Sequence, residues 1–144
     1  MTLNQIVKQI TAFGNNHEQI KFVYFGDVWE RLSNGEVTYP AMFFNLNDAQ
    51  ILAKQIQYNF SIYVMDRMLM EETNETEVLS DMTLVGQDMV ASLRDHIYEW
   101  IVSDNMSVTF FTESHPDYLA GLKIDFSLTL SPLNDTCQIP TNGI

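Results

Sequence analysis

The sequence predicts an α+β fold, namely a mainly antiparallel β-sheet of about five strands with two helices packed on one face. Two kinds of pattern predict it. Residues 56–64 and 122–130 alternate between apolar and polar side chains, as strands with one buried face do. Residues 3–13 and 82–100 instead carry apolar residues at helical spacing. Because each strand has a single apolar face, helices gathered on one face of the sheet would cover it.

The chain has 144 residues, which corresponds to one domain that can build a core without a metal or a disulfide. Pro132 ends the last alternating run, so we assign residues 1–132 to the domain and the turn-rich residues 133–144 to a C-terminal tail.

The one cysteine, Cys137, cannot form an intramolecular disulfide, which is compatible with a reducing compartment. We expect no signal peptide and no contact with a membrane, since no uncharged apolar stretch reaches about 18 residues.

The chain is strongly acidic, with seven Lys and Arg residues against nineteen Asp and Glu residues and a formal net charge of −12. The basic residues are scattered along the sequence. Phosphate binding needs clustered lysines and arginines that release counterions, so we do not expect stable binding of nucleic acid. The charge instead predicts weak repulsion of a phosphate backbone.

The first element is predicted to be a helix over residues 3–13. Thr2 is the expected N-cap, and Gly14 is expected to end the helix. The apolar residues of this segment recur every three or four positions, so the helix needs a sheet to cover them.

A β-hairpin is predicted next. Residues 20–25 are apolar, aromatic and β-branched, and the strand could continue through residues 28–32. The turn Ser33-Asn34-Gly35-Glu36 would lead into a partner strand over residues 37–45, because Asn-Gly favours tight hairpins. Pro40 would lie near the start of that strand or on an edge.

A long strand follows at residues 56–64. Extended from Ala49 to Leu69 it would exceed the usual strand length, so two shorter strands are the alternative. Residues 71–77 form an acidic stretch that lacks the spacing of a calcium loop, and we interpret it as a solvated loop.

The main helix is expected to begin at an N-cap, Ser80 or Asp81. Gly86 would allow it to approach the sheet closely. Residues 107–112 and 122–130 predict the last two strands. The apolar stripe of the helix indicates core packing rather than a cofactor site, and consists of Met82, Val85, Gly86, Met89, Leu93, His96, Ile97 and Trp100.

The sequence contains no constellation that predicts catalysis. The histidines His17, His96 and His115 do not have the spacing of zinc ligands. Cys137, His115 and Asp117 could form a nucleophilic set, but Cys137 lies among turn residues with no basic neighbour to activate it. Motifs for phosphate or dinucleotide binding are also absent from the sequence. We therefore predict no enzymatic activity, no cofactor and no metal site.

The pair Asp66-Arg67 ends the long strand. Arg67 is the only cation between Lys54 and Arg94, and acidic residues surround it in the sequence. An intramolecular pair is one interpretation. The other is a salt bridge between subunits, which would offset the repulsion between copies of an acidic chain.

Several segments, in this order, resemble the tail-completion (tail-terminator-like) proteins of tailed phages, as in phages of Bacteroides that include crAss-like phages. The first hairpin of that family is similar to Gly26-Asp27-Val28-Trp29-Glu30 and Tyr39-Pro40-Ala41-Met42-Phe43-Phe44. Its long strand is similar to residues 58–67. Val78-Leu79-Ser80-Asp81, before the main helix, is also similar, as is the terminal alternating strand that ends in Cys137-Gln138-Ile139-Pro140.

The resemblance implies a structural virion protein, assembled in the host cytoplasm, that forms an oligomeric ring at the head–tail junction or in the tail. Its partners would be copies of itself and the adjacent ring proteins or the portal, and DNA would pass through the lumen without specific binding. The interface candidates are Tyr39, Pro40, Tyr63, Asp66 and Arg67. The alternative function is an acidic protein-binding module, such as a DNA-mimic inhibitor or an adaptor for a basic partner.

Overall fold

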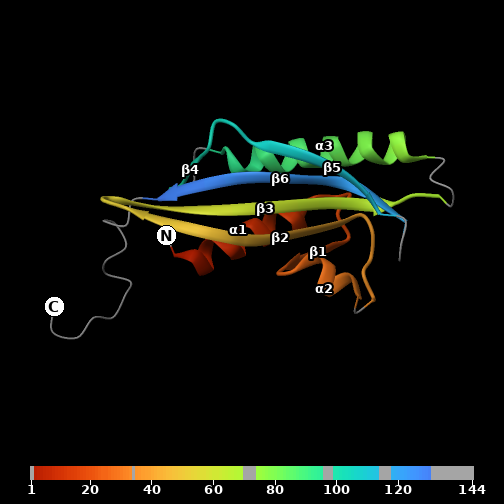
Figure 1. Cartoon of the computed structure of the whole chain (residues 1–144), viewed down its shortest axis with the longest axis horizontal. Coiled ribbons are helices and arrows are strands. Elements are labelled where there is room, and N and C mark those ends of the chain that lie inside the picture. The colour runs from red at the N-terminus through yellow and green to blue at the C-terminus, as the bar shows by residue number, and fades with distance from the viewer. Residues whose placement is uncertain (1, 34, 70–73, 96–98, 114–117, 131–144) are drawn as a thin grey trace.

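A computed structural model of the chain describes residues 2–33, 35–69, 74–95, 99–113 and 118–130. These residues form a mixed, largely antiparallel sheet with helices on both of its faces (Figure 1). The predicted α+β class is therefore confirmed. The strands are β1 (Phe22–Phe25), β2 (Ala41–Leu52), β3 (Gln55–Arg67), β4 (Ile101–Val102), β5 (Ser107–Glu113) and β6 (Leu119–Leu130).

The sheet has the order β1-β2-β3-β6, and both β4 and β5 pair with the remaining side of β6. Only the β1–β2 pair is parallel among the described pairs. The strands β2, β3 and β6 are the long central ones, with 12, 13 and 12 residues. Their length gives the molecule its elongated outline in Figure 1.

The described residues include three helices that cover the sheet, one more than predicted. Helices α1 (Leu3–Asn16) and α3 (Glu75–Leu93) share one face, where Ile10 and Met82 join a core cluster with Phe44 and Phe60 of the sheet. We call this the helix face. The short helix α2 (Val28–Ser33) packs against the opposite face, which we call the open face.

The predicted hairpin over residues 20–45 is wrong. The segment after β1 turns into α2, because the Asp27 carboxylate accepts hydrogen bonds from the backbone N–H groups of Trp29 (3.0 Å) and Glu30 (3.2 Å). Val28 and Leu32 are then buried one helical turn apart. The chain returns as β2, which begins at Ala41 and runs parallel to β1.

The N-terminal helix follows the prediction at its start and not at its end. Thr2 is the N-cap and forms a capping box with Gln5. Gly14 does not end the helix but lies buried inside it, and a Cβ there would be 2.7 Å from Cγ2 of Val23 and 2.9 Å from Sδ of Met42. The glycine therefore allows α1 to approach the sheet closely.

The long strand is shorter than its longest predicted extent. Residues 49–52 belong to the end of β2, and a tight turn at Ala53 and Lys54 leads into β3. One continuous strand over residues 49–69 is therefore wrong. Strands β5 and β6 lie where the last two strands were predicted, with β6 beginning three residues earlier, at Leu119.

The main helix begins earlier than predicted. Its N-cap is Asn74 rather than Ser80 or Asp81, and residues 75–77 of the expected acidic loop form its first turn. Carboxylates in a first turn favour the helix because they face its positive end. Residues 71–73 of the expected loop lie outside the described residues.

The predicted stripe of α3 is buried from Met82 to Leu93, where the helix ends. Trp100 is also buried, but it lies beyond the helix, and its indole N–H donates to the carbonyl of Leu93 at 2.8 Å. His96 and Ile97, like the tail after Leu130 with Cys137, lie outside the described residues.

Candidate subunit interface

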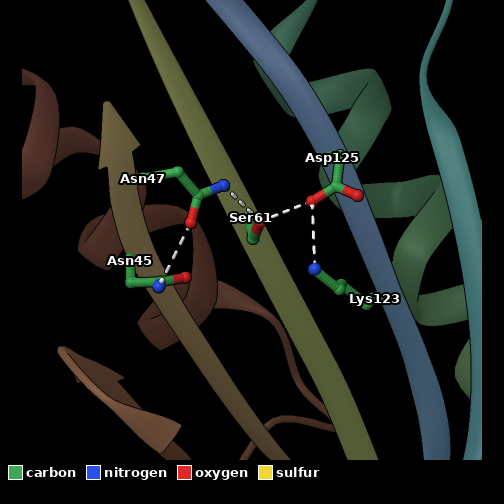
Figure 2. A network of polar contacts seen from close by, with 5 residues as sticks. All are labelled: Asn45, Asn47, Ser61, Lys123 and Asp125. Atoms are coloured by element: carbon green, nitrogen blue, oxygen red, sulfur yellow. Dashed lines mark hydrogen bonds and ion pairs between the residues drawn. The ribbon is translucent and has the colours of Figure 1, made fainter. Parts of the chain in front are cut away.

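A network of polar side chains crosses the open face of the sheet (Figure 2). The Asn47 amide on β2 donates to the Ser61 hydroxyl on β3 at 2.8 Å, and Ser61 donates to the Asp125 carboxylate on β6 at 2.5 Å. Lys123 forms an ion pair with Asp125 at 3.7 Å. Asn45 donates to Asn47 at 3.4 Å. The network therefore links the three central strands.

A second polar chain lies on the same face. Asn59 donates to Asp48 on β2 and accepts from the Ser127 hydroxyl on β6 at 2.6 Å. Ser61 is fully buried, whereas Asn47 and Asp48 are exposed. This part of the open face is thus held together by hydrogen bonds rather than by apolar packing.

An aromatic cluster lies beside the polar network. Tyr63 is flanked by Trp29 at 6.5 Å and Phe111 at 6.4 Å, measured between ring centroids. Basic side chains lie over neighbouring rings, since the Arg67 guanidinium is 5.1 Å from the Tyr39 centroid and the Lys123 ammonium is 5.9 Å from the Tyr63 centroid. Trp29 remains 46% exposed at the surface of this cluster.

The structure separates the five predicted interface residues. Tyr39, Tyr63 and Arg67 lie on the open face within the aromatic cluster, and Pro40 follows Tyr39 through a cis peptide bond just before β2. Asp66 points the other way, because successive residues of a strand alternate between faces.

Asp66 lies beneath α3. Its carboxylate accepts the backbone N–H of Arg67 at 2.8 Å. Burial raises the pKa of Asp66, and the nearby Asp81 carboxylate raises it further, although the Arg67 contacts lower it in part. Arg67 stacks on Tyr39 on the other face, so the two side chains of the Asp66-Arg67 pair are directed apart.

Two of the outer strands of the sheet, β1 and β5, have a free edge of several residues. Within the described part of the chain, β1 pairs only with β2, and β5 pairs only with β6. Large apolar side chains are exposed on both edges: Tyr24 is 37% exposed and Phe25 40%, while Val108 is 49% exposed and Phe110 54%. An edge of this kind is a template for pairing with another strand.

On β1, the backbone groups that point outward belong to Val23 and Phe25. The Gly26 N–H donates to the Phe44 carbonyl, so the even-numbered residues of β1 turn their backbone groups toward β2. The side chains of Val23 and Phe25 lie on the helix face, where Phe25 contacts Phe44 at 5.0 Å between centroids.

On β5, the corresponding residues are Val108 and Phe110. The Ser103 N–H donates to the Ser127 carbonyl, so the odd-numbered residues of β6 direct their backbone groups toward β4 and β5. Odd-numbered residues of β5 pair with odd-numbered residues of β6. The even-numbered residues of β5 therefore direct their backbone groups away from the sheet. Val108 lies on the helix face beside α3, and Phe110 shares that face by alternation.

A groove of about 520 Å³ lies between α3 and the β5–β6 edge. Gly86 allows the close approach of helix and sheet there, since a Cβ would lie 3.1 Å from Cδ1 of Ile124 and 3.2 Å from Cδ1 of Leu122. The lining is mostly aliphatic and consists of Thr83, Gly86, Gln87, Val90, Ala91, Arg94, Val108, Leu122 and Ile124.

The described residues bring together no group of three or more His, Cys, Asp or Glu side chains that could hold a metal ion. His17 instead joins the end of α1 to α3, with 2.8 Å between its Nε2 and the Asp88 carboxylate. His115, Asp117 and Cys137 lie outside the described residues. Among the helices described, none has both the length and the apolar character needed to cross a bilayer.

Comparison with known families finds no family model that matches the chain, and comparison with curated proteins finds no significant relative. The described residues form an α+β protein in which the edges of β1 and β5 carry exposed apolar side chains and part of the open face carries a polar network. The sequence predicted a strand over residues 107–112, where β5 lies, but it did not identify β5 or β1 as edges. Strand order decides which strands are outermost, and the alternation within a strand does not report it.

Proposed function

We propose that this chain is a structural virion protein that joins copies of itself into a ring at the head–tail junction or in the tail of a tailed phage. The observation that carries the proposal is the pair of free sheet edges with exposed apolar side chains. A closed ring needs two different, complementary surfaces on each subunit. The β1 edge and the β5 edge lie on opposite sides of the sheet and meet this requirement.

Edge-to-edge pairing supplies both affinity and orientation. Main-chain hydrogen bonds between β1 of one copy and β5 of the next would continue the sheet from subunit to subunit, and the exposed side chains would set the register. The buried apolar contact also explains how copies of a chain with a net charge of −12 would associate despite their repulsion.

The open face supports a role beside passing DNA. The polar network on this face consists of amides, hydroxyls and carboxylates, the aromatic cluster lies beside it, and the cations Arg67 and Lys123 lie over aromatic rings. A lumen of this composition would not hold a phosphate backbone, because retention needs clustered basic groups. Tyr39, Pro40, Tyr63, Asp66 and Arg67 remain candidates for contacts with adjacent subunits, with neighbouring ring proteins or with the portal.

Two measurements test this function. Negative-stain imaging of the purified chain should reveal rings, and mass spectrometry of purified phage particles from a host that expresses the gene should detect the chain in virions. Absence of the chain from such particles would contradict a virion role, even if the protein formed rings in solution. Monomers at every concentration, together with absence from particles, would contradict the whole proposal.

A second candidate function is an acidic module that binds a basic partner. The observation in its favour is the exposed side of α3, where Glu77, Asp81 and Asp88 are all exposed. Capture of basic proteins at low salt and their release at high salt would support it, because contacts between exposed charges are screened by salt. Capture that resists salt, or no capture, would count against it.

A further inference from the structure

We infer the register of the contact between copies: β5 of one subunit pairs antiparallel with β1 of the next, with Val108 opposite Phe25 and Phe110 opposite Val23. In this arrangement the Phe25 side chain enters the groove between α3 and β5 of the neighbouring copy. The inference rests on the proposed function and names the residues that would join the subunits.

Strand direction supports the antiparallel pairing. β1 runs parallel to β2, whereas each of the steps from β2 to β3, from β3 to β6 and from β6 to β5 reverses direction. Strand β5 therefore runs opposite to β1 within one subunit. If two copies continue one sheet with their helix faces on the same side, β5 and the next β1 are antiparallel.

The direction of the backbone groups and the face occupied by the side chains both favour this pairing. Val23 and Phe25 direct their backbone groups outward from one edge, as Val108 and Phe110 do from the other. These four residues also carry their side chains on the same face, the helix face. A pairing that joins outward backbone groups thus also places apolar side chains next to one another.

Three registers pair outward backbone groups with each other and keep these side chains on the helix face. The apolar side chains distinguish the three registers. With Phe25 opposite Val108, the pair Phe110 and Val23 is apolar, and Phe22 meets Phe111 on the open face. A shift of two residues in one direction would place Val23 opposite Thr112 and leave Val108 uncovered. A shift in the other direction would place Phe25 opposite Met106, which lies before β5 begins.

The groove has the chemistry that an aromatic ring requires. It lies on the helix face beside Val108, and Val90, Leu122 and Ile124 give it an aliphatic lining. Phe25 is 40% exposed in the isolated subunit, so part of its ring is available to a neighbour. Burial of an aromatic side chain in such a pocket is typical of the residues that dominate an interface.

A disulfide tests the register in the full chain. In a Cys137→Ser background, the double variant Phe25→Cys and Val108→Cys is oxidised under mild conditions and run on a non-reducing denaturing gel. The two sites are four strand spacings apart within one subunit, or about 19 Å, which is too far for an internal disulfide. A ladder of covalent oligomers is therefore expected only if the edges of different copies meet.

Two matched variants locate the contact. Phe25→Cys with Phe110→Cys is two residues out of register, and Phe25→Cys with Ile101→Cys uses an exposed residue of β4 on the same side of β6. The register predicts that each of these variants forms at most about one tenth of the covalent oligomer formed by the variant with Phe25→Cys and Val108→Cys, because a disulfide needs Cα atoms within about 7 Å. A dominant ladder from either variant would overturn the register while leaving edge-to-edge assembly intact.

A substitution without a disulfide gives an independent measurement. Phe25→Ser should raise the dissociation constant of the assembly at least about tenfold, because it removes the ring from the groove. Unchanged assembly of this variant would overturn the role of Phe25 but not the ring itself. If the wild-type chain is monomeric and no cysteine pair gives a ladder, both the register and the proposed function are contradicted.

Discussion

Ser61 and Asp125 face each other across the β3–β6 pair, and the Ser61 hydroxyl donates to the Asp125 carboxylate with 2.5 Å between the oxygens. The same hydroxyl accepts from Asn47. One fully buried serine on the open face therefore connects β2, β3 and β6.

Ser61→Ala should lower the free energy of unfolding by about 1 to 3 kcal/mol, because the substitution removes the two hydrogen bonds of a fully buried hydroxyl, one of them to the charged Asp125 carboxylate. Urea denaturation followed by circular dichroism measures the loss. Ser80→Ala, on the exposed side of α3, is the matched control and should change stability by no more than about 0.5 kcal/mol. Equal effects from both variants would show that the network contributes nothing specific.

Gly121→Ala should be among the most damaging substitutions of a glycine in this chain. A Cβ at Gly121 would lie 2.1 Å from the carbonyl oxygen of Val64, which is backbone and cannot move without displacing β3. We expect a loss of about 3 kcal/mol or more, or a failure to fold.

Gly86→Ala provides the contrast. Its Cβ would meet only the flexible ends of Ile124 and Leu122, and alanine stabilises a helix interior by about 1 kcal/mol relative to glycine. The midpoint of thermal unfolding should therefore change little for Gly86→Ala and fall strongly for Gly121→Ala. The reverse order would contradict the strand pairing between β3 and β6.

Asp66→Asn should stabilise the protein at neutral pH. Burial raises the pKa of Asp66 above its ordinary value of 3.8, so the folded state binds the proton more tightly than the unfolded state. The ionised Asp66 carboxylate lowers the free energy of unfolding. This loss is absent below pH 3.8, where Asp66 is protonated in both the folded and the unfolded state, and it develops as the pH rises through the pKa of Asp66 in the folded state.

The gain from Asp66→Asn should therefore be present at pH 7 and disappear below pH 3.8. Urea unfolding at a series of pH values measures this difference. Asp104→Asn, at an exposed position, should change stability little across the range. A gain for Asp66→Asn that persisted at low pH would mean that the amide acts through packing rather than through the lost charge.

Salt should strengthen the assembly of the wild-type chain. Copies that each carry a net charge of −12 repel one another, and raising the salt from about 50 to 500 mM screens this repulsion without weakening apolar edge contacts. Sedimentation velocity at the two salt concentrations measures the change. Dissociation at high salt would instead indicate ion pairs between subunits, and Arg67→Gln would then identify whether Arg67 forms them.

The sequence predicted the elements whose signals are local. Thr2 is the N-cap, as predicted, and the alternation in residues 122–130 indicates β6 because one face of that strand is buried. The stripe from Met82 to Leu93 likewise identified the buried side of α3.

The segment between β1 and β2 could not be predicted from a turn signal alone. Asn34 and Gly35 favour a hairpin, but Asp27 caps a helix and Val28 and Leu32 anchor it to the open face. This segment therefore carries both a hairpin signal and a helix signal, and the tertiary packing of Val28 and Leu32 favours the helix. The free edges also could not be predicted from the sequence, because they depend on a parallel β1–β2 pair and on strand order.

The mass of the wild-type chain in solution tests self-assembly through the sheet edges most directly. Native mass spectrometry over a range of concentrations should give one dominant species at a whole multiple of the 16.6 kDa monomer, with Phe25→Ser shifted toward the monomer. A wild-type chain that stays at 16.6 kDa at every concentration would contradict the claim that its free edges join one copy to the next.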